Sequence, residues 1–409
     1  MTLAVAFNVE TFRQQFPFFQ ANPNWVYLDN AATSHKPQIM LDSLQHFYAS
    51  ANSNIHRGAH SLGDQATQLY EQARQHVADF IGAEQAEQII FTSGTTAALN
   101  QLAFGLMGTV LQPGDRILLT TLEHHANIVP WQLHCQSKGV VLDVVPLTVD
   151  HQLDMAAFSR LLQHQPKVVS FCHVSNVLGQ VLPVADMVQQ AQAVGALTVI
   201  DGAQGILHDT IDVQQLNTDF YVFSGHKIYG PTGVGVLYGK TKALECLTPL
   251  LGGGEMIQHV SFDHTRYHQL PFRLEAGTSA IAEVIALGTT LHWLAKQDRT
   301  GMRQHKQQLL QHGWQQLEAM PQLELLSSAT NNAGIITFNV RGEHPTDVAT
   351  LLNEQKIAVR AGQHCAMPLF ANIHHPGAVR LSLAAYTTQA EVDAAINAIR
   401  MAVELLCPS

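Results

Sequence analysis

ThrValIleAspGlyAlaGln (residues 198–204) is the stretch of sequence that decides the fold, because it places a carboxylate directly after a short apolar run. A β-branched run of this length, closed by a glycine, predicts a buried strand that ends near Asp201. Burying a carboxylate is costly unless a cation pairs with it. A pyridinium N–H would be such a cation, and the carboxylate would keep the ring nitrogen protonated. The structural alternative is an aspartate that caps the following turn.

Apolar runs on both sides of this stretch alternate with helical patterns from about residue 60 to residue 240. Strands are predicted for the runs QIIFTSG, RILLT, GVVLDVVPL and KVVSFCHV. Between the last of these and Asp201, Pro183 and Gly195 mark the start and the end of a helix. Strands of this kind that alternate with helices predict an α/β fold around a mainly parallel sheet, covered on both faces. Functional residues of such folds lie just after the carboxyl ends of strands.

The pattern changes after the glycine-rich stretch LeuGlyGlyGlyGlu (251–255). A long polar-faced helix is predicted over roughly residues 280–318, followed by the strand-like runs GIITFNV and AVRLSLAAY. A closing helix is predicted from Thr388. This order predicts a second, smaller α+β domain.

SerGlyHisLysIleTyrGlyProThrGly (224–233) contains a lysine suited to forming a covalent bond with a carbonyl group. Lys227 follows the apolar run PheTyrValPhe and precedes a turn rich in glycine and proline, so we expect its stem in a desolvated place. Burial lowers the pKa of a lysine and leaves its amine free to form an imine. Ser224 and His226 add a hydroxyl and an imidazole, which are donors that suit a phosphate. The alternative is a lysine on a surface loop.

Two further motifs follow predicted strands. In PheThrSerGlyThrThr (91–96), Gly94 permits a tight turn and Thr95 opens a helix whose unpaired N–H groups form an anion site. A plain N-cap uses the same geometry, so both interpretations can hold. In GluHisHisAlaAsn (123–127), an imidazole could stack on an aromatic cofactor and move protons. A histidine pair on the surface is the alternative.

ArgAlaGlyGlnHisCysAla (360–366) places Cys365 in a glycine-containing loop beside His364, a setting that suits an exposed, activated thiol. An inert buried cysteine is the alternative, and we adopt that interpretation for Cys135, Cys172, Cys246 and Cys407. In ValArgLeuSer (379–382), Arg380 lies on a predicted strand and could hold a substrate carboxylate through two hydrogen bonds. An ordinary ion pair is its alternative.

The composition of the 409-residue chain indicates which kinds of partner it can have. Hydrophobic residues make up 46 % and charged residues only 13 %, against about 25 % charged residues in an average soluble domain. So small a charged fraction predicts extensive subunit burial, in an obligate homodimer. The net charge of −10, without a basic cluster, argues against nucleic acid or an anionic membrane as a partner.

The sequence also predicts a cytoplasmic protein. Its N-terminal residues lack the basic region of a signal peptide, and no stretch is long and apolar enough to span a bilayer. The five cysteines form no C-x-x-C motif, so neither a disulfide framework nor a structural zinc site is expected. His56 and His60 have the spacing of a helical metal pair, but Arg57 and Gly58 between them favour a loop. No metal site is predicted.

Taken in this order, the motifs resemble those of the class V aminotransferase fold. More narrowly, they resemble the group II cysteine desulfurases, a group that includes selenocysteine lyases and cysteine sulfinate desulfinases. The resemblance runs from about Tyr27 to near the C-terminus. It is carried by TyrLeuAspAsnAlaAlaThr, AsnIleHisArgGly, GluHisHisAlaAsn, AspGlyAlaGln, SerGlyHisLys, GluAlaGlyThr and ArgAlaGlyGlnHisCysAla. The chain is most similar to the sulfinate desulfinase branch.

The resemblance implies an α/β fold of the PLP-dependent transferase type I, with pyridoxal 5′-phosphate as the cofactor. It implies a large cofactor-binding domain over residues 21–265, with a seven-stranded, mainly parallel sheet. A smaller α+β domain over residues 266–409 is expected to carry the catalytic cysteine. Residues 1–20 are expected to form a segment that packs on the small domain.

The resemblance also implies roles for individual residues. Lys227 would hold the cofactor as a Schiff base, Asp201 would pair with its ring nitrogen, and Cys365 would take the sulfur. The other implied cofactor contacts are His124 on the ring, Asn176 and Gln204 near its hydroxyl group, Thr95, Ser224 and His226 at the phosphate, and Thr278 from the other subunit. The substrate carboxylate would be held by Arg380, Arg360 and Asn30. Relatives commonly read Gly-Thr-Pro-Asn where this chain has GlyThrSerAla (277–280), which keeps Thr278 but alters the loop after it.

The reaction implied by the resemblance converts L-cysteine to L-alanine, holds the sulfur as a persulfide on Cys365 and passes it to an acceptor protein, as in iron–sulfur cluster assembly. Selenocysteine and cysteine sulfinate are expected as further substrates. An aminotransferase or a kynureninase-like lyase on the same fold would use Lys227 and Asp201 but would have no use for Cys365. The sequence also leaves open a sulfur relay without turnover of its own and a histidine-rich metal-binding protein.

Overall fold

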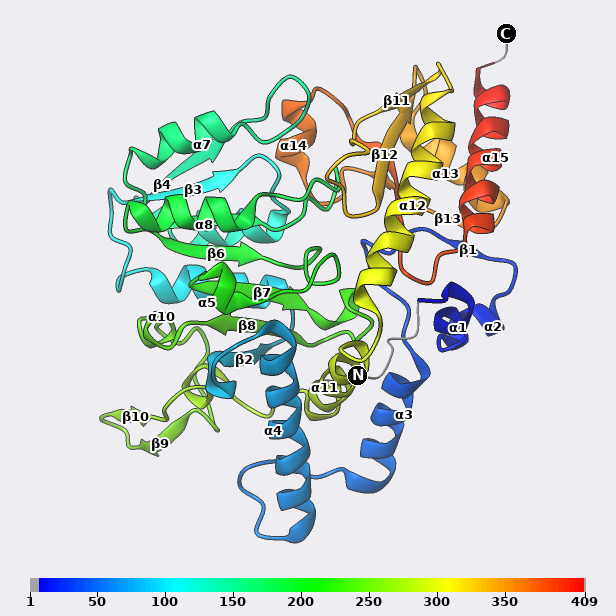
Figure 1. The fold of residues 1–409 in the computed structure, drawn as a ribbon. Helices are drawn as coiled ribbons and strands as arrows, with labels where there is room; N and C mark the ends of the chain where they lie inside the picture. Colours follow the sequence, from blue (N-terminus) through cyan, green and yellow to red (C-terminus); the bar gives the residue numbers. More distant parts are fainter. Residues whose placement is uncertain (1–6, 408–409) are drawn as a thin grey trace.

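A central seven-stranded sheet organises residues 7–407, the part of the chain that this computed structural model describes (Figure 1). Its strand order is β2-β8-β7-β6-β5-β3-β4. The strands are β2 (Ile89–Thr92), β3 (Arg116–Thr120), β4 (Val141–Val145), β5 (Val168–Cys172), β6 (Leu197–Asp201), β7 (Phe220–Ser224) and β8 (Gly235–Gly239). β8 is antiparallel to β2 and β7, whereas the other pairs are parallel. The predicted α/β fold around a mainly parallel sheet is confirmed.

Helices cover both faces of this sheet because successive residues of a strand point to opposite sides. In β7, Phe220 belongs to one apolar cluster and the next residue, Tyr221, belongs to the other. One cluster includes α5 (Thr95–Leu106) and α6 (Val129–His134), and the other includes α4 (Ser61–Ile81), α7 (Met155–Leu162) and α8 (Val184–Ala193). The loops at the strand ends are therefore held by a core on each side.

A smaller, four-stranded antiparallel sheet lies in the C-terminal part of the chain, in the order β11-β12-β15-β14. Its strands are β11 (Leu323–Leu325), β12 (Ile335–Val340), β14 (Arg360–Gly362) and β15 (Ala378–Ser382), and they pack with α12 (Arg299–Glu318), α13 (Pro345–Glu354) and α15 (Gln389–Leu406). This arrangement confirms the predicted α+β character of the region. The domain limits 21–265 and 266–409 themselves stay a prediction.

The remaining helices and strands are short. They are α1 (Val9–Arg13), α2 (Pro17–Ala21), α3 (Gln38–His46), α9 (Val213–Leu216), α10 (Thr241–Glu245), α14 (Met367–Asn372), the pair β1 (Val26–Tyr27) and β13 (Ile357–Ala358), and the hairpin of β9 (Ile257–Val260) and β10 (Thr265–Tyr267). Within residues 7–407, no helix combines the length and the apolar character needed to cross a membrane.

The single long helix predicted over residues 280–318 is wrong, because two helices occupy this region. α11 (Ile281–Leu294) is largely buried against α4, and a Cβ at Gly288 would lie 2.5 Å from the Cα of Ala73. α12 begins after Asp298, whose carboxylate accepts hydrogen bonds from the N–H of Gly301 at 2.9 Å and of Phe7 at 3.1 Å. An aspartate that caps a new helix in this way separates it from the one before.

The N-terminal segment packs against the start of α15. Arg13 donates hydrogen bonds to both carboxylate oxygens of Glu391, at 2.8 and 2.9 Å, and to the carbonyl oxygen of Tyr386 at 2.9 Å. Residues 1–6 of the predicted segment 1–20 lie outside the described residues. The segment as a unit of its own stays a prediction.

Candidate active site

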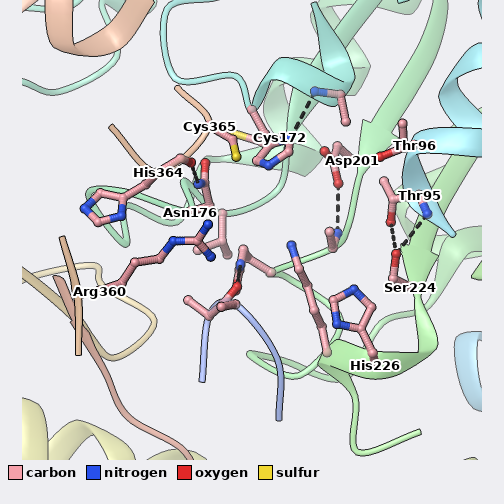
Figure 2. A pocket seen from close by; sticks show the side chains of 18 of the residues that line it. Thr95, Thr96, Cys172, Asn176, Asp201, Ser224, His226, Arg360, His364 and Cys365 are labelled. Carbon is pink, nitrogen blue, oxygen red and sulfur yellow. Dashed lines mark hydrogen bonds between the residues drawn. The ribbon is translucent and has the colours of Figure 1, made fainter. Parts of the chain in front are cut away.

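A pocket of about 770 Å³ opens at the carboxyl ends of β2, β3, β5, β6 and β7, and residues of β14 and β15 supply its other wall (Figure 2). The predicted site residues that line it are Thr95, His124, Asn176, Asp201, Gln204, Ser224, His226, Lys227, Arg360, Cys365 and Arg380. They meet because parallel strands all end at the same edge of a sheet. Asn30 and Thr278 line other pockets.

Asp201 and Lys227 form the electrostatic centre of the pocket. Asp201 is 5 % exposed, and its carboxylate accepts a hydrogen bond from the Ala203 N–H at 2.9 Å. Burial raises the pKa of Asp201, and the positive charge of Lys227 opposes that shift. Burial likewise lowers the pKa of Lys227, against the pull of Asp201. The pocket therefore favours a neutral amine at Lys227 and leaves the Asp201 carboxylate in need of a cation.

A cradle for an anion lies where β2 turns into α5. Gly94 has φ 148° and offers no side chain to cap the helix, so the first N–H groups of α5 receive no hydrogen bond from the N-cap residue. Thr95 donates its backbone N–H to Ser224 Oγ at 2.8 Å, and the two hydroxyl oxygens also lie 2.8 Å apart. Any side chain at Gly235 would lie 2.4 Å from Gly94 Cα, so the turn depends on two glycines. This combination suits a phosphate.

His124 lies in the same pocket, directly after β3. Its Nδ1 accepts a hydrogen bond from the Ala126 N–H at 3.0 Å, so the proton of the neutral ring is assigned to Nε2. Burial, assisted by the charge of Lys227, lowers the pKa of His124 to about 4. The ring is therefore neutral at physiological pH and presents a flat face and one N–H group.

Gln204 and His226 are held by the segment that follows β1. Gln204 donates from Nε2 to the carbonyl oxygen of Ala31 at 2.7 Å. The carbonyl oxygen of His226, which precedes the Lys227 peptide, accepts hydrogen bonds from Ser34 Oγ and from Lys36 Nζ, both at 3.0 Å. The turn that carries Lys227 is thus fixed from outside its own strand.

Asn176 connects the end of β5 to the loop that carries Cys365. Its Nδ2 donates to the carbonyl oxygen of His364 at 2.7 Å, and its Oδ1 is buried without a partner among the described residues. His364 and Cys365 have φ angles of 48° and 57°, a conformation that costs roughly 1–2 kcal/mol per residue with a side chain. Cys365 itself is exposed at the pocket mouth, as predicted for this thiol.

The structure changes the interpretation of His364. Its ring is buried, and its Nε2 lies 3.0 Å from the carbonyl oxygen of Ala378. Burial lowers the pKa of His364 to about 3, so the neutral ring donates to that carbonyl. No hydrogen bond within residues 7–407 joins this ring to the Cys365 thiol. His364 anchors the loop to β15.

The two predicted arginines differ in how firmly the protein holds them. Arg380 is 2 % exposed and donates to the carbonyl oxygen of Asn176 at 2.8 Å and to Asp29 Oδ1 at 3.0 Å, while its Nε has no partner within residues 7–407. Arg360 lies opposite Arg380 in the β14–β15 ladder and points into the pocket (Figure 2). No hydrogen bond or ion pair with another described residue engages its guanidinium.

Asn30 is built into the fold rather than into the pocket wall. Its Nδ2 donates to the carbonyl oxygen of Ser382 at 2.7 Å, and its Oδ1 accepts from the Tyr386 hydroxyl. Thr278 lies in a separate pocket of about 860 Å³, beside Phe91 and Glu275. The roles predicted for these two residues stay predictions.

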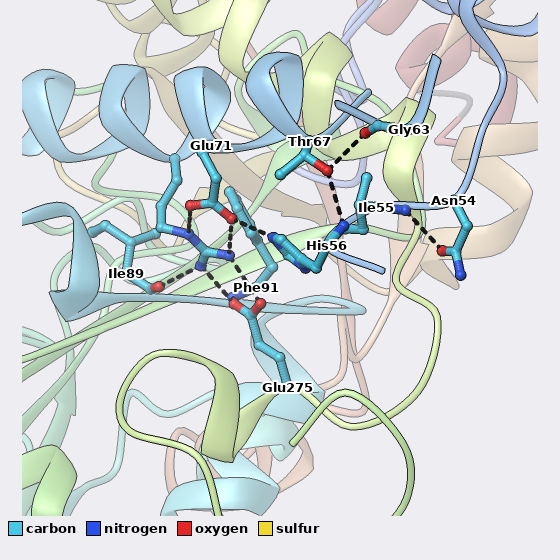
Figure 3. Close-up of polar contacts among 10 residues, drawn as sticks. Asn54, Ile55, His56, Gly63, Thr67, Glu71, Ile89, Phe91 and Glu275 are labelled. Carbon is cyan, nitrogen blue, oxygen red and sulfur yellow. Dashed lines mark hydrogen bonds and ion pairs between the residues drawn. The ribbon is translucent and has the colours of Figure 1, made fainter. Parts of the chain in front are cut away.

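A buried network supports the chain before Thr278 (Figure 3). Arg74, which is 1 % exposed, donates to both carboxylate oxygens of Glu275 at 2.7 and 3.0 Å and to Glu71 at 2.9 Å. Glu275 also accepts from the Phe91 N–H at 2.6 Å. Glu71 lies 2.9 Å from His56 Nε2, so His56 belongs to this network and lies in a loop, as predicted.

Glu123 is a buried carboxylate beneath the pocket that sequence reasoning missed. It accepts hydrogen bonds from Thr120 Oγ1 at 2.6 Å, from Asn127 Nδ2 at 2.7 Å and from the Cys172 N–H at 3.1 Å. Burial raises its pKa to about 7. The signal was available, because Glu123 follows a predicted strand in the way that Asp201 does.

The cysteines outside the active-site loop divide into two groups. Cys135 and Cys172 are buried as predicted, and Cys172 also lines the pocket, where burial raises the pKa of its thiol. The prediction is wrong for Cys246, which is exposed, and for Cys407, which is half-buried. Both lie at the C-terminal ends of helices, where a side chain is only partly covered.

Pyridoxal 5′-phosphate fits this set of groups. The capless N-terminus of α5 with Ser224 provides donors for a phosphate, Asp201 provides the anion for a ring N–H, and Lys227 provides an amine for a carbonyl carbon. Asn176 Oδ1 and Arg380 Nε have no partner among residues 7–407, so both are available for hydrogen bonds to a bound group. A nucleotide or a metal ion would not account for the amine and the isolated carboxylate together.

Comparison with known proteins agrees with this fit. The family described as aminotransferase class-V matches residues 26–395. A probable cysteine desulfurase of Vibrio cholerae is 46 % identical over 402 residues, which cover 98 % of this chain and 99 % of the relative. The cysteine desulfurase CsdA of Escherichia coli has a TM-score of 0.91 at 40 % identity, over 98 % of this chain and 100 % of that chain.

A cysteine desulfurase from Thermococcus onnurineus NA1 has a TM-score of 0.93 at 33 % identity, again over 98 % of this chain and 100 % of that chain. These similarities extend over the whole chain, and the family match spans both the central sheet and the smaller one. The chain therefore belongs to the aminotransferase class-V family of pyridoxal-phosphate enzymes, and its full-length relatives are cysteine desulfurases.

Proposed function

We propose that this enzyme is a cysteine desulfurase that converts L-cysteine to L-alanine and holds the sulfur as a persulfide on Cys365. The observation that carries the proposal is the exposed Cys365 thiol at the mouth of the pocket that also contains the Lys227 amine. An aminotransferase needs the amine and Asp201 but no thiol. A thiol at this place gives the sulfur of a bound substrate a nucleophile.

The cofactor would be held by the groups that converge on the pocket. Lys227 would bind its carbonyl carbon, Asp201 its ring nitrogen and His124 its ring face. Thr95, Ser224 and His226 would hold the phosphate, and Asn176 and Gln204 would contact the side of the ring hydroxyl. When bound, pyridoxal phosphate supplies an electron sink for the charge that develops at Cα of the substrate.

Lys227 serves as the base of the reaction in this proposal. Because burial lowers the pKa of its amine, the neutral form is available to accept the Cα proton of the substrate. Asp201 has no competing ion pair within residues 7–407, so it can stabilise a cation on the ring nitrogen. His124 lines the same pocket, and its Nε2–H can hold or return a proton near the substrate.

Cys365 takes the sulfur in the next step. The thiolate attacks the Sγ atom of the substrate, a new S–S bond forms, and the Cβ–Sγ bond breaks with its electron pair going to Cβ. A proton then completes the methyl group of alanine. The balance is one L-cysteine and one Cys365 thiol to one L-alanine and one Cys365 persulfide, with no external oxidant.

The substrate carboxylate would be bound mainly by Arg360, with Arg380 behind it. The guanidinium of Arg360 points into the pocket and has no partner among the described residues, whereas both terminal nitrogens of Arg380 already donate a hydrogen bond to the protein. Asn30, whose amide is fully bonded within the fold, would act on the carboxylate only through the segment that it anchors.

The proposal includes an acceptor protein that takes the persulfide sulfur, as in iron–sulfur cluster assembly, and a cytoplasmic homodimer in which Thr278 reaches the phosphate of the other subunit. The exposed position of Cys365 supports transfer to an acceptor protein. The low content of charged residues, 13 %, and the location of Thr278 outside the pocket that contains Lys227 support the homodimer. Selenocysteine and cysteine sulfinate are proposed as further substrates, since they carry better leaving groups at Cβ.

The test compares wild type and Cys365→Ala for release of alanine and sulfide from L-cysteine, with a reductant present. We expect the variant to lose turnover of cysteine while its visible cofactor absorption is unchanged. Cleavage of selenocysteine and cysteine sulfinate should be reduced less, because their leaving groups depend less on a thiol. An equal loss on all three substrates would overturn the role of Cys365 as sulfur acceptor.

A further inference from the structure

The second histidine of the GluHisHisAlaAsn motif contacts the Cys365 loop at two points. The backbone N–H of His125 donates to the carbonyl oxygen of Cys365 at 2.7 Å. The ring Nε2 of the same residue accepts a hydrogen bond from the N–H of Met367 at 2.9 Å. One residue of the large sheet region thus holds the backbone on both sides of Ala366.

The ring contact caps a helix of the smaller region. Met367 is the first residue of α14, and Ala366 at the N-cap position has no side chain that could accept a hydrogen bond. The first N–H groups of a helix need an acceptor, which usually comes from the residue before it. Here the acceptor comes from His125, which is distant in sequence and follows β3 directly.

These contacts hold the backbone of the loop that positions the Cys365 thiol. His364 and Cys365 both have left-handed φ angles, at 48° and 57°, so the loop needs external bonds to keep this conformation. Asn176 bonds the carbonyl oxygen of His364, and His125 bonds the two following points. Without the His125 ring, the bonds to the carbonyl oxygens of His364 and Cys365 would remain and the bond to the Met367 N–H would be lost.

The bond to Met367 requires a neutral His125 ring. A ring nitrogen that accepts a hydrogen bond must carry a lone pair, so the proton of the neutral ring is on Nδ1. Burial lowers the pKa of His125, which favours this state at neutral pH. Protonation at lower pH would convert Nε2 into a donor that faces the Met367 N–H, and the bond would be lost.

The surroundings of His125 contain few other titratable groups. On its own segment are His124, whose ring centroid is 6.2 Å away, and the fully bonded Glu123. The loop adds the Cys365 thiol and the buried His364, whose ring donates to the carbonyl oxygen of Ala378, and β5 adds the Cys172 thiol. α6 adds His134, which lies 3.2 Å from Asn100 Oδ1. α5 and α14 carry no charged side chain.

We propose that His125 is a positioning residue that latches the Cys365 loop against the large sheet region and releases it on protonation. The inference rests on the proposed role of Cys365 as sulfur acceptor. His125 is joined by one peptide bond to His124, the residue proposed to stack on the cofactor, and so connects that residue to the thiol loop. The enzyme would therefore expose a mobile Cys365 loop under acidic conditions and an ordered one at neutral pH.

The test measures hydrogen–deuterium exchange of peptides that cover residues 363–370 in the holoenzyme, corrected for the intrinsic pH dependence of exchange. Wild type, His125→Gln and His125→Ala are compared at several pH values between 8 and 4.5. A glutamine amide oxygen reaches about as far as Nε2 and accepts a hydrogen bond without titrating. His134→Gln is the matched control, because this histidine lies at the end of α6, the helix that follows His125, and its recorded hydrogen bond within residues 7–407 is to Asn100 and not to the loop.

We expect wild type to be protected at pH 8 and to lose protection about fivefold or more as the pH falls, since one backbone hydrogen bond is broken. His125→Gln should stay protected across the range, and His125→Ala should lack the protection that the ring supplies at every pH, although its backbone N–H still donates to Cys365. His134→Gln should follow wild type. Protection in His125→Ala equal to that of wild type, or the same pH dependence in His125→Gln as in wild type, would overturn the proposal.

Exchange does not depend on turnover, so this result is separate from the proposed function. Turnover of L-cysteine by the Cys365→Ala variant would overturn the sulfur-acceptor role and leave the exchange result intact. If exchange in wild type showed no pH-dependent protection while turnover still required Cys365, the role of His125 would be overturned and the sulfur-acceptor role of Cys365 would stand. Visible absorption of the bound cofactor in each variant checks that the pocket has folded.

Discussion

The side chain of Asn176 joins the end of β5 to the residue next to Cys365, because its Nδ2 donates to the carbonyl oxygen of His364 over 2.7 Å. The backbone carbonyl of the same asparagine accepts from Arg380 at 2.8 Å. One residue therefore orders both the predicted carboxylate-binding arginine and the predicted thiol loop. Asn176 also lines the pocket, and its Oδ1 has no partner in the part of the chain that the structure describes.

Replacement of Asn176 by alanine should destabilise the protein and slow turnover together. The His364 carbonyl would be left without its buried donor, which costs about 1–3 kcal/mol. Urea unfolding of the holoenzyme measures the loss of stability, and alanine release measures the rate. Asn176→Asp should be the more harmful change, because a carboxylate would face the carbonyl oxygen with no donor. Wild-type stability in both variants would contradict the observed geometry.

Substitution by lysine should have different effects on stability at Arg360 and at Arg380. Arg360→Lys is expected to raise KM for L-cysteine by about ten- to a hundredfold, the worth of one charge-assisted hydrogen bond, with little change in stability. Arg380→Lys should also lower the free energy of unfolding, because Asp29 and the Asn176 carbonyl lose a buried partner. Steady-state kinetics and thermal unfolding of the two variants check this difference. Equal effects on KM and on stability would refute the distinction.

The residues around Asp201 and Lys227 show why much of this site could be predicted from the sequence. Both follow apolar runs that fold as β6 and β7, and parallel strands must end at one edge, so local signals suffice to bring the two residues together. Thr95 and His124 follow the same logic after β2 and β3. Such predictions require only that the carboxyl ends of the strands be located in the sequence.

Contacts that depend on distant partners could not be predicted in this way. The ring of His364 turns to Ala378 on another strand, and the ring of His125 reaches Met367 in the other sheet region. The break before α12 depends on Asp298, which in the sequence is one polar residue among many. In each case the deciding partner lies outside the local pattern.

Arg74 is expected to be a major determinant of stability near the Thr278 loop. Arg74→Met should cost about 3–5 kcal/mol, because it leaves the buried Glu275 carboxylate without a cation. The double variant with Glu275→Gln should recover part of this loss, since the amide oxygen still accepts from the Phe91 N–H. Denaturant unfolding of the single and double variants measures the coupling. Strictly additive losses would show that the pair is not coupled.

His35 gives a prediction for the pH dependence of stability. Its ring stacks on Phe18 with centroids 3.6 Å apart, and its buried Nε2 has no partner within residues 7–407. Burial lowers the pKa of His35 from 6.5 to about 4. A histidine whose pKa is lowered by folding adds stability above pH 6.5, and this contribution is lost as the pH falls from 6.5 toward 4.

His35→Phe should remove that pH dependence, because a phenyl ring keeps the stacking and carries no titrating nitrogen. At pH 7.5 the variant should be at least as stable as wild type, since an unpartnered polar atom has been removed. Near pH 5 it should be more stable by an amount of the order of 1 kcal/mol, which allows for the partial exposure of the ring. Urea unfolding at both pH values measures the difference, with the exposed His259 replaced by phenylalanine as the control. If His35→Phe loses as much stability on acidification as wild type does, the ring is not kept neutral by burial.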